Sequence, residues 1–266
     1  MKVSNQAQNQ KISSINSNLH KIDKKHNERL SSGKKINSAA DDAAGLAIAK
    51  KMEALINGIG KGVNNAYDMQ NAIKTADGSL DSINDGLLRI KELSLQASSP
   101  ILTDSDKAII QEEIDQTLQG INDIANNTQF NGQNLLDGSF TDKHTAINSN
   151  GSGLSVSIGA VNTTSLGLDG FSVMGYNIDL TVLDKAIDTI SSSRTKIGAN
   201  INRLDHSIAS NSNSALNMVS SKSKIEDADM AKESILKSTN QALSQYGIFA
   251  QKNQAQTQYN MLNILF

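Results

Sequence analysis

Histidine and acidic side chains are the groups in this sequence that could bind a metal or act as acid–base catalysts. The four histidines, His20, His26, His144 and His206, are scattered along the chain, and no HExxH motif of a metal-bound hydrolase occurs. His20 and His26 are six positions apart, which places them on different faces of a helix. We therefore expect four solvated imidazoles and no metal or catalytic site.

The segment GIGKG at 58–62 has the composition of a phosphate-binding loop without its spacing. It fits neither GxxxxGK[ST] nor GxGxxG, and no strand pattern precedes it. Because the segment lies inside a helical pattern, close packing of helices is the better interpretation. We expect no cofactor. A helical enzyme stays as an alternative of a different class, but no pair of base and nucleophile supports it.

Charge and composition narrow the class of protein further. The chain has 25 basic and 27 acidic residues, so it lacks the basic excess that nucleic-acid binding usually requires. The absence of cysteine excludes disulfides and thiolate sites. Aromatic residues make up only 3%, which suits a long helical protein that buries a stripe. No apolar run approaches the roughly 18 residues of a membrane-spanning helix.

Apolar residues recur at steps of three and four in the first half of the chain, the spacing of helices that pack on helices. The first such stretch breaks at Gly33, a plausible helix end. Ser38 and Asp41 resemble a capping box before a second helix from about 43 to 97, which would be about 80 Å long. Pro100 ends it. Thr103 or Ser105 caps a third helix, antiparallel to the second, that ends near 126–127.

The helical spacing of apolar residues is interrupted at about 129–176. Asn-Gly and Asp-Gly turn signals occur there, and Leu154, Val156 and Ile158 alternate with other residues. These features predict one or two β-hairpins.

Helical spacing then returns from Leu183 to Ile225. Arg194, Asn211 and Lys222 occupy positions that the repeat would make apolar. Polar residues in such a seam can fix register at some cost in stability.

The last helix begins near Asp227 and Asp229 and carries apolar residues almost to the chain end. Exposed apolar residues are unusual at a terminus, so we expect a partner to bury them. The predicted fold is mainly α: a long antiparallel helical coiled-coil rod with a small β-hairpin region. The apolar residues for which we predict a role in subunit packing are Ile235, Leu236, Leu243, Phe249, Leu262 and Leu265.

One segment resembles a known family closely. ERLSSGKKINSAADDAAGLAIAKKM, from Glu28 to Met52, is similar to bacterial flagellin. LRIKEL at 88–93, TQFNG at 128–132, SRTKIGANINRL at 193–204 and IEDADMA at 225–231 follow in flagellin order. The resemblance covers roughly 1–137 and 178–266, so the large variable outer domains of longer flagellins are absent.

The resemblance implies a flagellin fold and a structural role. Residues 1–40 and 226–266 would form the inner-tube coiled coil of a helical filament, and 41–225 the outer tube. The filament would be extracellular and used for motility, with its subunits exported by the flagellar type III route without a cleavable signal peptide. Implied partners are further copies of the chain, an export chaperone, the filament cap and hook-junction proteins. A hook–filament junction adaptor or a minor flagellin stays as the alternative.

Two sets of residues are candidate contact sites. Ala43, Ala44 and Gly45 are small and would let helices approach closely between subunits. Asp41 and Asp42 would either cap the second helix or pair with a basic neighbour.

Arg89, Leu93 and Glu113 match positions that, in some flagellins, contribute to binding of the vertebrate Toll-like flagellin receptor. Leu88 stands where the family usually has Gln. The alternative, which we favour as the primary role, is that Arg89 and Glu113 form ion pairs between helices or subunits.

Overall fold

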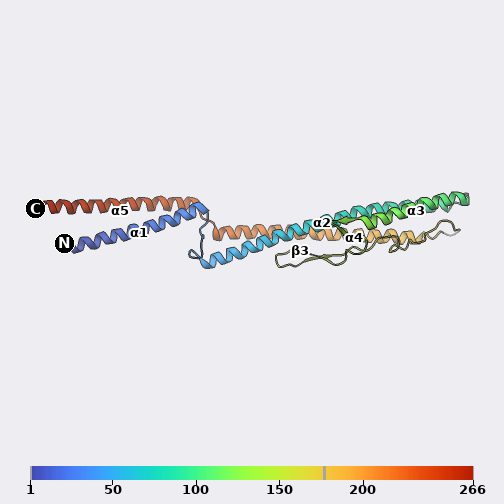
Figure 1. The fold of residues 1–266 in the computed structure, drawn as a ribbon, viewed down its shortest axis with the longest axis horizontal. Helices are drawn as coiled ribbons and strands as arrows, with labels where there is room; N and C mark the ends of the chain where they lie inside the picture. The colour runs from blue at the N-terminus through green and yellow to red at the C-terminus, as the bar shows by residue number, and fades with distance from the viewer. Residues whose placement is uncertain (1, 176–177, 266) are drawn as a thin grey trace. The chain divides into compact units, whose positions relative to one another are not determined.

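The computed structural model describes residues 2–175 and 178–265, with the side chains of 2–9, 258 and 261–265 outside the description. It confirms a mainly helical fold with a small β region between the third and fourth helices. The second helix has the predicted bounds, and the third ends where predicted. The helices are α1 (Lys2–Ser32), α2 (Ala43–Ala97), α3 (Asp104–Asn127), α4 (Thr181–Glu226) and α5 (Met230–Leu265) (Figure 1).

The chain divides into two compact units. The terminal unit comprises Met1–Ala54 and Asn217–Phe266, and the central unit comprises Leu55–Leu216. Helices α2 and α4 therefore contribute residues to both. The predicted boundaries at 40/41 and 225/226 refer to layers of an assembled filament, so they stay a prediction.

In the central unit, α2 and α4 are antiparallel and are joined by polar pairs. Lys91 Nζ lies 2.6 Å from Asp184 Oδ1, and Arg194 Nη1 lies 2.6 Å from Asp81 Oδ1, so the partners run in opposite chain order. Arg194 is one of the polar residues at apolar positions of the helical repeat, and its ion pair helps to fix the register between α2 and α4. Beneath these pairs lies an apolar core. Its fully buried members include Ile73, Leu80, Ile83, Leu87 and Ile90 of α2, Ile114 and Ile121 of α3, and Leu183 and Ile190 of α4.

Helix ends follow the local sequence. Thr103 caps α3 in a capping box with Asp106, because each side chain accepts a hydrogen bond from the other residue's backbone N–H. At the end of α1, Gly33 adopts φ +69° and its N–H donates to the carbonyl of Arg29 at 2.9 Å. Glycine takes this left-handed conformation without steric cost.

The described residues form two antiparallel hairpins. Asn131 and Gly132 form the first turn with φ of +50° and +75°, which is the conformation that Asn-Gly favours in a two-residue hairpin turn. The strands end at Val156, so the stretch from 157 to 175 consists of turns and loops rather than further hairpin. The strands are β1 (Gln129–Phe130), β2 (Gln133–Asn134), β3 (Lys143–Ala146) and β4 (Gly153–Val156).

The loop between β3 and β4 lies directly on α2. A Cβ on Gly62 would lie 1.9 Å from the carbonyl oxygen of Ile147, whereas one on Gly60 would meet nothing within 4 Å. Asn65 Nδ2 donates to the carbonyl of Ala146 at 3.1 Å, and Asn211 Nδ2 donates to that of Ile147 at 3.0 Å. Gly58 and Gly62 therefore serve close packing, whereas Gly60 does not. The expected packing partner was wrong, since it is a hairpin loop and not a helix.

Candidate functional site

The two connections between the long helices pair with each other in the terminal unit. The N–H of Lys35 donates to the carbonyl of Glu226 at 2.6 Å, and the N–H of Ala228 donates to the carbonyl of Gly33 at 2.9 Å. We call this antiparallel pairing of Gly33–Lys35 with Glu226–Ala228 the connector clasp. The clasp therefore joins two connecting segments. One is the start of the segment between α1 and α2, and the other is the segment between α4 and α5.

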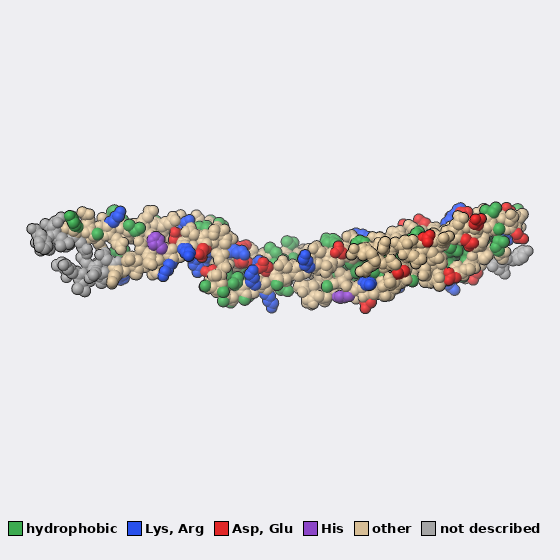
Figure 2. Space-filling model, in the orientation of Figure 1, with side chains coloured by type: hydrophobic (Ala, Val, Ile, Leu, Met, Phe, Trp, Pro, Cys, Tyr) green, Lys and Arg blue, Asp and Glu red, His purple; other side chains and the backbone are tan. Residues whose placement is uncertain are grey.

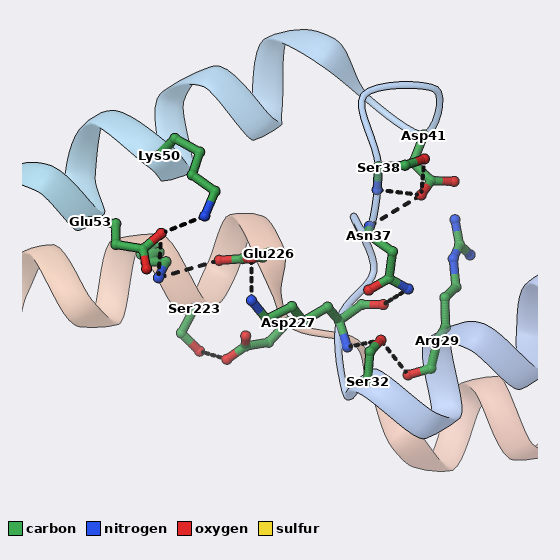
Figure 3. Close-up of polar contacts among 12 residues, drawn as sticks. Arg29, Ser32, Asn37, Ser38, Asp41, Lys50, Glu53, Ser223, Glu226 and Asp227 are labelled. Atoms are coloured by element: carbon green, nitrogen blue, oxygen red, sulfur yellow. Dashed lines mark hydrogen bonds and ion pairs between the residues drawn. The ribbon is translucent and has the colours of Figure 1, made fainter.

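A buried carboxylate lies at the centre of the clasp. Glu226 is 5% exposed, and its Oε1 accepts from Lys34 Nζ at 2.6 Å while its Oε2 lies 3.6 Å from Lys222 Nζ. Lys222 Nζ is also 3.7 Å from Glu53, which accepts a hydrogen bond from Lys50 (Figure 3). The hydrogen bond to Glu226 raises the pKa of Lys34, and that from Lys50 lowers the pKa of Glu53. A carboxylate removed from water needs such partners to stay charged.

The two aspartates before α2 have different roles. Asp42 Oδ1 accepts from the N–H of Gly45 at 2.9 Å, so Asp42 caps the helix. Asp41 instead accepts from the backbone N–H and hydroxyl of Ser38 and forms an ion pair with Lys25 at 2.8 Å. The expectation that Ser38 and Asp41 cap α2 was wrong, because α2 begins only at Ala43 and these residues close a turn ahead of it.

Asp41→Asn is expected to lower the free energy of unfolding at pH 7 by about 1–2 kcal/mol. The hydrogen bond with Lys25 and those from the backbone lower the pKa of Asp41 from 3.8 to about 2. Since the folded pKa is depressed, its stabilising effect is present above pH 3.8 and lost as the pH falls towards 2. Urea unfolding followed by circular dichroism should therefore give curves that converge as the pH approaches 2.

Asp42→Asn is the matched control, since asparagine caps helices about as well as aspartate and should change stability by only a few tenths of a kcal/mol. A difference between wild type and Asp41→Asn that persists unchanged at pH 2 would contradict the assignment.

A buried polar cluster joins α1 to α5. His26 Nδ1 contacts Glu233 Oε2, and Arg29 Nη1 donates to Glu233 Oε1 at 3.0 Å. Burial raises the pKa of Glu233, but the hydrogen bonds from His26 and Arg29 lower it by more, so the net shift is downward. The expectation of a solvated His26 was wrong, whereas His20, His144 and His206 are exposed.

The signal for this burial was present in the spacing. His26 lies four residues after Ile22 and continues the three/four repeat of α1. A residue at such a position faces the neighbouring helix whatever its polarity. Its partner Glu233 lies 207 residues away, and nothing in the sequence pointed to the pair.

The described part of the chain holds no cluster of three or more histidine, cysteine or acidic residues that could bind a metal ion. Among the same residues, every helix falls short of the length and apolar character that a membrane span requires. Basic and acidic side chains are interspersed over the visible face (Figure 2).

Comparison with known proteins identifies the family. A model of the bacterial flagellin N-terminal helical region matches residues 3–141, and a model of the bacterial flagellin C-terminal helical region matches residues 180–265. The chain belongs to the bacterial flagellin family. Only residues 142–179 separate the two matched regions, so this family member is a short form without a large domain between them.

Several relatives of this flagellin-family chain match it over most of both chains. It is 36% identical over 271 residues to a flagellin of Bacillus subtilis (strain 168), with 86% of this chain and 89% of the relative covered. It is 35% identical over 254 residues to flagellin FlaB2 of Treponema pallidum (strain Nichols), with 87% and 88% covered. A putative flagellar hook-associated protein from Vibrio parahaemolyticus shares the fold, with a TM-score of 0.57 and 17% identity over 70% of this chain and all of that chain.

The predicted packing residues of this flagellin-family chain lie at the start of α2 and along α5. Ala43 and Ala44 are exposed, whereas Gly45 is buried against Asp42 and Ile36 of its own chain. On α5, a line of apolar side chains at helical spacing is between 39% and 73% exposed. We call it the α5 stripe. Leu262 and Leu265 were also predicted to pack, but their side chains lie outside the described residues. The α5 stripe consists of Ile235, Leu236, Leu243, Tyr246 and Phe249.

The predicted receptor residues do not form one exposed surface. Arg89 donates through Nη2 and Nε to Glu113 Oε1, at 2.7 and 3.1 Å, so the two side chains pair across α2 and α3. Leu93 is 2% exposed and belongs to the core. The ion pair that we favoured is present within one chain, and Arg89 and Glu113 remain exposed.

Proposed function

We propose that this chain is a structural subunit of the bacterial flagellar filament and polymerises with copies of itself through α1 and α5. The α5 stripe carries the proposal: it exposes five large apolar side chains on one described helix, and scattered apolar residues are usual on soluble surfaces whereas a continuous stripe is not. Membership of the flagellin family supports the same role.

A helical polymer requires a contact that does not close on itself. One surface of each subunit must bind a different surface of the next, so that addition continues. The α5 stripe and the half-exposed Ile15 and Ile22 of α1 offer apolar surface for such contacts. The connector clasp supports the role by holding the end of α1 beside the short connection that leads from α4 into α5.

Electron microscopy of the purified chain after seeding with short filament fragments tests this function. Long tubular filaments are expected. A chain that adds a single layer to a hook or filament end and then stops would instead be a hook–filament junction adaptor. Whether the chain is a major or a minor flagellin would follow from its proportion in native filaments.

Replacing Ala43 and Ala44 with leucine is expected to block polymerisation while leaving the soluble chain folded. Both residues are exposed in the first turn of α2, where larger side chains would keep a neighbouring helix away. Ala108→Leu, at an exposed position of α3, is the matched control. Sedimentation after seeding would measure polymer, and normal filaments from the double variant would refute the packing role.

Other partners belong to this proposal. An export chaperone, the filament cap and hook-junction proteins would bind the chain before or during assembly, and export would take the flagellar type III route to the cell exterior. The chain would act structurally and not as an enzyme. For the vertebrate Toll-like flagellin receptor, exposed Arg89 and Glu113 are the candidate contacts, and a receptor reporter assay with Arg89→Ala monomer would test them.

A further inference from the structure

The packing between α1 and α5 is unusual in what it buries. Among the described side chains of these two helices, the residues below 9% exposure are His26 and Glu233, at 8% and 7%. Every described apolar side chain of the same helices is at least partly exposed. Apolar burial therefore gives this helix pair little preference for one alignment over another.

We propose that His26, Arg29 and Glu233 fix the register in which α1 pairs with α5. The carboxylate of Glu233 is satisfied by both donors in the observed alignment, through His26 Nδ1 and Arg29 Nη1. Asn16 and Ser244 lie in the same alignment, since Ser244 Oγ donates to Asn16 Oδ1 at 2.9 Å. The two contacts together define an antiparallel pair of one register (Figure 1).

A slip of one helical turn has a clear cost. Four residues before and after His26 on α1 stand Ile22 and Leu30. A shifted α5 would place the carboxylate of Glu233 opposite one of these apolar side chains, without its donors. An unpaired buried charge is strongly destabilising, whereas the correctly paired cluster adds little net stability. Arg29 Nε is buried without a hydrogen-bond partner among the described residues, so even the correct register bears some cost.

The consequence concerns assembly, and this step rests on the proposed function. The register determines the position of the α5 stripe along the axis of α1. Neighbouring copies can form a regular lattice only if the stripe has the same axial position in every subunit. A buried polar contact that selects one register among similar apolar ones has the role of a polar residue in a coiled-coil seam.

Disulfide trapping tests the register, and the chain has no native cysteine to interfere. Asn16→Cys with Ser244→Cys reports the observed alignment. Asn16→Cys with Asn240→Cys reports a slip of about 6 Å, beyond the reach of a disulfide in the native register. The ratio of the two disulfide yields is measured on the full-length chain after mild oxidation.

The native-register disulfide is expected to exceed the slipped one by at least about tenfold. In the background His26→Leu with Glu233→Leu, which replaces the polar pair by apolar side chains, the ratio should fall by at least about threefold. It should stay above unity, because a slip would also break the hydrogen bonds of the connector clasp. His20→Leu, at an exposed position of α1, is the matched control and should leave the ratio unchanged.

An unchanged ratio in the double variant would overturn the proposal, because the register would then be set elsewhere. Loss of both disulfides would also overturn it, since the cluster would then hold the helices together without selecting a register. Failure of the wild-type chain to polymerise would count against the proposed function alone, as the disulfide ratio is measured without filaments.

Discussion

Replacing Gly62 with alanine is expected to destabilise the central unit by roughly 3 kcal/mol. The new Cβ would lie 1.9 Å from the carbonyl oxygen of Ile147 and 2.5 Å from its carbon, and both are backbone atoms that cannot rotate away. Alanine in a helix gains about 1 kcal/mol over glycine, which does not offset a clash of this size. The loop between β3 and β4 must move off α2, and the hydrogen bonds from Asn65 and Asn211 are lost with it.

Gly60→Ala is the matched control, two residues away on the same helix. Nothing lies within 4 Å of its added Cβ, so helix propensity alone should raise stability by about 0.5–1 kcal/mol. Urea unfolding of the two variants, followed by circular dichroism, should therefore shift the midpoint in opposite directions. Equal midpoints would show that the hairpin loop does not pack on α2 as described.

Replacing Leu243 and Phe249 with aspartate is expected to abolish polymerisation. The two side chains are 52% and 60% exposed, so the soluble chain should keep its helical content and stability. Between subunits, however, the change would place two carboxylates in an apolar contact without partners, which costs several kcal/mol each. Because every subunit in a polymer repeats the contact, growth should stop even from a wild-type seed.

The measurement is the concentration of soluble chain that remains after seeding, combined with electron microscopy. Asn253→Asp is the control, since it adds one carboxylate at an exposed position of α5 without removing an apolar side chain. It should polymerise like the wild type. Filaments from the double variant would exclude the α5 stripe as a subunit contact.

Local sequence determined much of this protein. The three/four spacing predicted α2 from 43 to 97, which are its observed ends, because each apolar position depends only on its neighbours in the same helix. Gly33 and Thr103 marked helix ends through their own backbone and side-chain hydrogen bonds. Asn131-Gly132 marked a hairpin turn through its backbone preferences. The family, too, followed from contiguous segments.

Contacts between distant segments were decided only by the tertiary structure. Glycine spacing indicated a close approach on α2 but could not name Ile147 as the partner. Leu93 matched a receptor position, yet its place in the core depends on helices that fold over it. The spacing placed His26 on the buried face of α1, but its partner Glu233 lies 207 residues away in the sequence. The spacing of apolar residues indicates which face of a helix is buried. Which residues pack against that face depends on how distant segments of the chain fold onto it.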